Sequence, residues 1–90
     1  MPKPIEELHE WVYNYMETEL GAQHSKDDKL VEVIDSLDVL NIIMEVEELF
    51  LPPSVMIEDK TVQDWLKNKD LTIEHFLDNI VISVKEILEE

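Results

Sequence analysis

The 90-residue chain contains no cysteine, no arginine and only one glycine. Without cysteine it has no disulfide, no thiolate zinc site and no thiol nucleophile of its own. A single glycine also excludes the glycine-rich loop that cradles phosphates in nucleotide-binding proteins. One glycine and four prolines provide few turns, which favours helices over a β-sandwich or a barrel.

Long apolar runs are also missing. No run approaches the roughly 18 residues that a membrane span requires, so we expect no membrane segment. Residues 1–7 lack the apolar region of a secretory signal peptide. Ninety residues fit one domain, 1–90, with a single modest core. We therefore expect a monomeric cytoplasmic protein of one domain.

Charge is strongly one-sided, with 22 acidic residues against seven lysines and a formal net charge of −15. Nucleic acids and anionic lipids bind proteins through Lys and Arg, so neither is expected as a partner. One interpretation is that the charge keeps the protein soluble. The other is that the acidic surface attracts and orients basic partner proteins.

Apolar residues recur at spacings of three and four in three segments, which predicts helices at residues 4–20, 35–50 and from about 72 onward. Gly21 and Pro52-Pro53 are typical of the ends of the first two. A shorter helix is predicted at 61–69, where Thr61 and Asp64 have capping-box spacing.

Residues 22–34 are predicted to form a structured loop rather than a strand. Its apolar residues would anchor it on the core; they are Leu30, Val31, Val33 and Ile34. The predicted fold is therefore all-α, with four helices, a long first loop and a short third helix.

The helix at 35–50 has two apolar stripes when residues are placed about 100° apart. The core stripe consists of Val39, Ile42, Ile43, Val46 and Phe50. The other consists of Leu37, Leu40 and Met44, and the polar residues around it are Asp38, Asn41, Glu45, Glu47 and Glu48. One small core cannot bury both stripes, so the second predicts an exposed docking patch for a basic partner. Alternatively, Leu37 and Leu40 pack under the first loop.

Ser36 lies at the start of this helix, where free backbone N–H groups and the helix dipole favour an anion. Alternatively, Ser36 serves only as the N-cap, a position that serine often occupies. No metal site is expected, because His9, His24 and His75 are scattered and Asp27-Asp28 lacks the EF-hand pattern. Nor does the sequence contain a catalytic constellation, so we do not expect an enzyme.

Asp35-Ser36-Leu37 opens an acidic helix that ends in Glu47-Glu48-Leu49-Phe50. Together with Asp38 and Met44, these residues resemble the acyl carrier protein family. The resemblance covers the whole chain: a helix ending at a glycine, a long loop, the helix that opens with Asp-Ser-Leu, a short third helix and a closing one.

The resemblance implies a carrier whose Ser36 receives 4′-phosphopantetheine from coenzyme A, transferred by a magnesium-dependent phosphopantetheinyl transferase. Cargo would ride on the terminal thiol of this arm as a thioester. Asp35 would lie beside the metal during transfer. Partner enzymes with basic surfaces would contact Leu37, Asp38, Leu40, Asn41, Met44, Glu47 and Glu48.

Three departures from the family pattern leave the cargo open. Val33-Ile34 replaces a segment that usually contains glycine, Asn41 replaces a common glutamate, and the loop from Gly21 to Asp35 is shorter than in the fatty-acid type. A carrier for fatty acids, aminoacyl groups or secondary-metabolite intermediates fits the resemblance. The alternative function is an unmodified acidic adaptor that uses the Leu37, Leu40 and Met44 patch.

Overall fold

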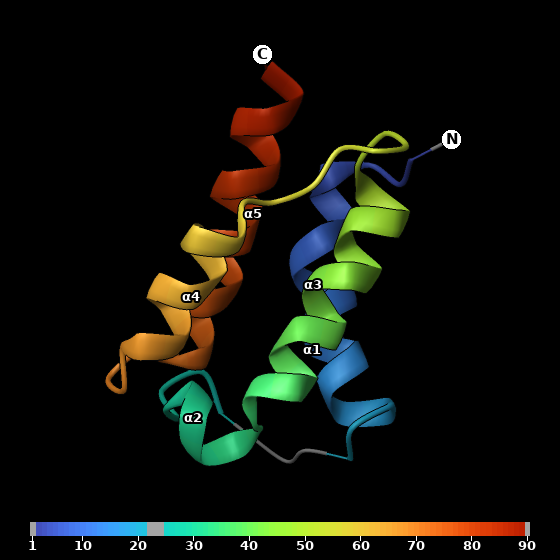
Figure 1. Cartoon of the computed structure of the whole chain (residues 1–90). Coiled ribbons are helices and arrows are strands. Elements are labelled where there is room, and N and C mark those ends of the chain that lie inside the picture. The colour runs from blue at the N-terminus through green and yellow to red at the C-terminus, as the bar shows by residue number, and fades with distance from the viewer. Residues whose placement is uncertain (1, 22–24, 90) are drawn as a thin grey trace.

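The computed structural model describes residues 2–21 and 25–89, and the regular elements in these ranges are helices joined by irregular connections (Figure 1). Its elements are the 3₁₀ helix η1 (Ile5–Glu7) and the α-helices α1 (Leu8–Thr18), α2 (Leu30–Val33), α3 (Ser36–Phe50), α4 (Asp59–Lys67) and α5 (Ile73–Glu89). No strand occurs in the described ranges, where one isolated bridge joins Lys29 and Thr72. The four predicted helices are present, together with the additional one-turn helix α2.

Helix α1 packs against both α3 and α5, and α4 lies along α5 (Figure 1). The connection between α3 and α4 lies at the same end of the molecule as the two chain ends. Helix α2 and the start of α3 lie at the opposite end. Ser36 is therefore at the end of the molecule where α2 leads into α3.

The core consists of the inward stripes of the three long helices. The predicted stripe of α3 is confirmed, since Val39, Ile42, Ile43, Val46 and Phe50 are all buried. Helix α1 contributes Leu8, Val12 and Met16. Trp65 of α4 packs edge-on against Phe76, with ring centroids 6.1 Å apart, and so joins the short helix to α5.

Helix α5 has 17 residues and buries most of the predicted stripe. Its buried residues are Ile73, Phe76, Leu77, Ile80 and Val84. Leu88 is 45% exposed because the last turns extend past the other helices (Figure 1). Neither α5 nor another helix in the described ranges is long and apolar enough to cross a membrane.

The connection ahead of α3 is fastened to the segment before α5. The Leu30 N–H donates to the Leu71 carbonyl at 2.9 Å, and the Ile73 N–H donates to the Asp28 carbonyl at 2.9 Å. Leu30 and Ile34 are buried, as predicted. Val31 is 43% exposed because it faces away from these contacts on α2, so the prediction that it anchors the loop was wrong.

Two predicted helix boundaries differ in outcome. Gly21 has φ of 64°, which confirms that the chain turns there just after α1. Helix α4 begins at Asp59, and Thr61 lies within its first turn, so the predicted capping box was wrong. Val62 is buried and Leu66, one turn later, packs against the core.

Ile80 and Ile82 provide a test of this arrangement, because both lie within α5 and differ in burial. Ile80 is fully buried, whereas Ile82 is 53% exposed. Ile80→Val should lower the free energy of unfolding by about 0.5–1.5 kcal/mol, since it removes a buried methyl group. Ile82→Val should change it by less than about 0.5 kcal/mol. Urea unfolding measures both, and equal losses would contradict the orientation of α5.

Candidate functional site at the start and exposed face of helix α3

Helix α3 begins with a capping box formed by two aspartates. The Asp38 N–H donates to the Asp35 carboxylate at 2.9 Å, and the Asp35 N–H donates to the Asp38 carboxylate at 3.5 Å. Asp35 is the N-cap, with φ −93° and ψ 176°. The alternative in which Ser36 is the N-cap is therefore wrong, because the preceding residue occupies that position.

Ser36 is the first residue within α3 and is exposed. Its hydroxyl forms no hydrogen bond with any described residue. The N–H groups of Ser36 and Leu37 also lack partners in the described ranges, as is usual in a first helical turn. A free hydroxyl and two free backbone donors therefore lie together at the start of the helix.

The second apolar stripe of α3 is exposed, as predicted. Leu37 is 68% exposed, Met44 is 64% exposed and Leu40 is 37% exposed. The alternative that the first loop covers Leu37 and Leu40 does not hold for the part of that connection that the structure describes. Spacings of three and four residues place the three side chains in one row running from the Ser36 end.

The polar residues around this row differ in exposure and bonding. Asn41 and Glu48 are exposed, whereas Asp38 and Glu47 are partly buried. The Ile57 N–H donates to the Glu47 carboxylate at 2.7 Å, across the connection between α3 and α4. Glu47, which sequence reasoning placed among the partner-binding residues, is thus also engaged within the fold.

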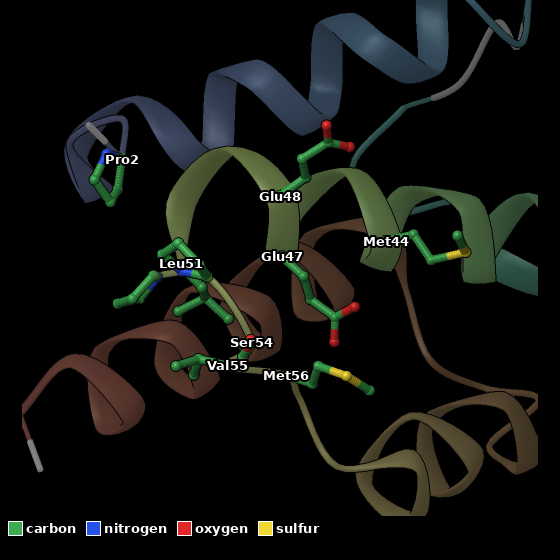
Figure 2. A pocket seen from close by; sticks show the side chains of 10 residues that line it. Pro2, Met44, Glu47, Glu48, Leu51, Ser54, Val55 and Met56 are labelled. Carbon is green, nitrogen blue, oxygen red and sulfur yellow. The ribbon is translucent and has the colours of Figure 1, made fainter.

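A surface groove of about 540 Å³ continues the exposed row toward the end of α3 (Figure 2). Met44 borders it from the helix, and Val55 and Met56 border it from the connection. Figure 2 shows Glu47 directed toward this connection and Glu48 directed to the other side of α3. Met56 is 64% exposed.

Sequence reasoning missed the contribution of Val55 and Met56 to this surface. A signal was available, because an apolar pair follows Pro52-Pro53 in a connection too short to bury every apolar residue. The hydrogen bond between Glu47 and Ile57, which are ten positions apart, joins this connection to α3.

The remaining candidate positions do not form a site. Asp28 accepts a hydrogen bond from the Ser25 N–H at 2.8 Å, which closes a local turn. His24 lies outside the described residues, and His9 and His75 belong to different helices. Within residues 2–21 and 25–89, no three His, Asp or Glu side chains gather closely enough to hold a metal ion.

Comparison of the chain with protein-family models, curated proteins and solved structures found no match. A functional interpretation therefore depends on the residues of the chain itself. The distinctive features are the free hydroxyl of Ser36, the exposed row behind it and the acidic residues on both sides of that row.

Asp35 and Ser36 should respond differently to replacement by alanine, although they are neighbours. Asp35→Ala removes the cap and should cost about 0.5–2 kcal/mol of stability. Ser36→Ala removes no hydrogen bond and should change stability by less than about 0.5 kcal/mol. Urea unfolding of both variants checks this. A larger loss for Ser36→Ala than for Asp35→Ala would contradict the assigned cap.

Glu47 and Glu48 offer a second matched pair on α3. Glu47→Ala leaves the Ile57 N–H without its acceptor and should cost about 1–2 kcal/mol, whereas Glu48→Ala removes no hydrogen bond. Amide exchange at Ile57 should become faster in the first variant alone. Unchanged exchange in Glu47→Ala would show that this hydrogen bond does not hold the connection.

Proposed function

We propose that this chain is a carrier domain that holds 4′-phosphopantetheine on Ser36 and presents thioester-bound cargo to partner enzymes. The observation that carries the proposal is the state of Ser36, whose exposed hydroxyl has no role in capping or bonding α3. A serine that served the fold would be expected to donate or accept a hydrogen bond there. Asp35 and Asp38 cap this helix start instead.

The surroundings of Ser36 fit a phosphodiester. The unpartnered N–H groups of Ser36 and Leu37 point out of the first turn, where the positive end of the helix dipole favours an anion. The carboxylates of Asp35 and Asp38 lie in the same turn and would oppose a second anion unless a cation accompanies it. This requirement for a cation is compatible with a transferase that supplies magnesium, with Asp35 next to the metal.

The bound arm would supply a terminal thiol, which this cysteine-free chain lacks. Tethering replaces the free encounter of cargo and enzyme by an intramolecular one at high effective concentration. The chain needs no catalytic residues for this role. Its own task is to hold the attachment point at an accessible end and to offer partners a docking surface.

The exposed face of α3 supports docking by basic enzymes. Leu37, Leu40 and Met44 form an apolar row that a partner can cover. Asp38, Asn41 and Glu48 lie beside it, and Glu47 adds its charge although its carboxylate also accepts from Ile57. An apolar centre with acidic neighbours favours a basic partner, including the transferase itself.

The helix pattern supports an acyl-carrier-like fold for the whole chain, with α1, α3 and α5 as long helices and α4 as the short one. Two departures from the fatty-acid type remain. They are the connection from Gly21 to Asp35, which includes α2, and Asn41 on the exposed face of α3. The cargo class is therefore left to experiment, among acyl, aminoacyl and secondary-metabolite groups.

Intact-mass measurement tests the proposal directly. The chain is incubated with coenzyme A, magnesium and phosphopantetheinyl transferases of more than one type. The wild-type chain should gain the mass of one phosphopantetheine group, and Ser36→Ala, which should keep its fold, should gain none. Absence of any gain with every transferase would reject the carrier function and favour an unmodified acidic adaptor that uses the same α3 face.

A further inference from the structure

Two aromatic rings lie on the side of α1 that faces α3. Trp11 and Tyr15, one helical turn apart, are stacked with ring centroids 5.2 Å apart and an interplanar angle of 28°. Trp11 also packs at a steep angle against Phe50 of the core, with ring centroids 5.9 Å apart, which fixes the indole in place. Both aromatic residues are only partly buried.

A surface hollow of about 430 Å³ opens beside these rings. Its lining residues are Trp11, Asn14, Tyr15, Thr18, Glu19 and Glu45. No lysine is among these residues, whereas Lys3 lines a neighbouring hollow that shares Trp11 and Asn14 with this one. The two rings and two carboxylates therefore form a site to which the described residues contribute no cation.

The carboxylates of Glu19 and Glu45 are unpaired within the described ranges, where neither accepts a hydrogen bond or forms an ion pair. Burial raises the pKa of the Tyr15 hydroxyl, and the negative charges of Glu45, Glu19 and Asp38 raise it further. The same field that disfavours a tyrosinate would stabilise a cation placed beside the ring.

We propose that the Trp11 and Tyr15 rings, with Glu19 and Glu45, bind an arginine side chain presented by a partner protein. A guanidinium group is planar, stacks on aromatic faces and pairs with carboxylates through two parallel hydrogen bonds. The chain has no arginine of its own to occupy the site. Lysine matches it less well, since an ammonium is more strongly hydrated and cannot stack.

This arginine site is distinct from Ser36 and from the Leu37, Leu40 and Met44 row. Glu45 lies about 14 Å along α3 from Ser36 and about 100° around the helix from Met44. Its occupation requires no phosphopantetheine. Loss of the carrier function in Ser36→Ala would therefore leave binding at this site unchanged, so the two proposals fail or succeed separately.

The two tryptophans allow a test with an internal control. The ¹⁵N-labelled chain is titrated with a capped Ala-Arg-Ala tripeptide, and the indole N–H signals of Trp11 and Trp65 are followed by NMR. The Trp11 signal should shift along a saturating curve while the Trp65 signal stays in place, because Trp65 of α4 packs against Phe76 of α5. A capped Ala-Lys-Ala tripeptide should bind about two- to fivefold more weakly.

Glu45→Gln and Glu74→Gln provide matched variants, each removing one negative charge from an exposed or partly exposed helix position. Glu45→Gln should weaken binding of the arginine tripeptide about two- to fivefold, and Glu74→Gln should leave it unchanged. No shift of the Trp11 signal, equal shifts of both indoles, equal affinity for the lysine tripeptide or equal effects of the two variants would each overturn the arginine site.

Discussion

The pair of hydrogen bonds between Asp35 and Asp38 fixes the start of α3, and the position of Ser36 within the first turn follows from that start. A helix that began one residue later would be capped by Ser36, and the hydroxyl would then be committed to the backbone. With Asp35 as the cap, Ser36 becomes the first helical residue, and its hydroxyl bonds to none of the described residues. The same turn keeps Leu37 on the outside while Val39 enters the core.

The periodic features of the molecule were predictable from sequence because burial acts on whole helix faces. The inward stripe of α3 and most of that of α5 follow from spacings of three and four residues. The exposed row on α3 was predictable for the same reason, since one small core cannot bury two stripes. The turn at Gly21 was predictable because a left-handed backbone conformation strongly favours glycine.

Choices between adjacent, chemically similar residues were harder. Asp35 and Ser36 are both good N-caps, and the deciding residue was Asp38, which has capping-box spacing from Asp35 only. Thr61 and Asp64 had that spacing too, yet α4 starts at Asp59 and Thr61 lies within its first turn. The contact of Glu47 with Ile57 depends on tertiary structure, so no local pattern indicates it.

Few of the negative charges are paired with positive charges within the described fold. One side-chain ion pair, between Lys29 and Asp70, is found in the described ranges; its atoms are 3.4 Å apart and its side chains are 48% and 88% exposed. Such a pair contributes little to stability. Most of the negative charge therefore remains uncompensated within the chain and is available to a partner with basic residues.

On the two proposals, α3 would set the orientation of a partner. Met44 and Glu45 are consecutive, so the apolar row and the arginine site lie about 100° apart around one helix. A single apolar contact leaves a partner free to rotate, because the hydrophobic effect is not directional. An arginine held between Glu45 and the Trp11 and Tyr15 rings would remove that freedom, since its bidentate geometry is specific.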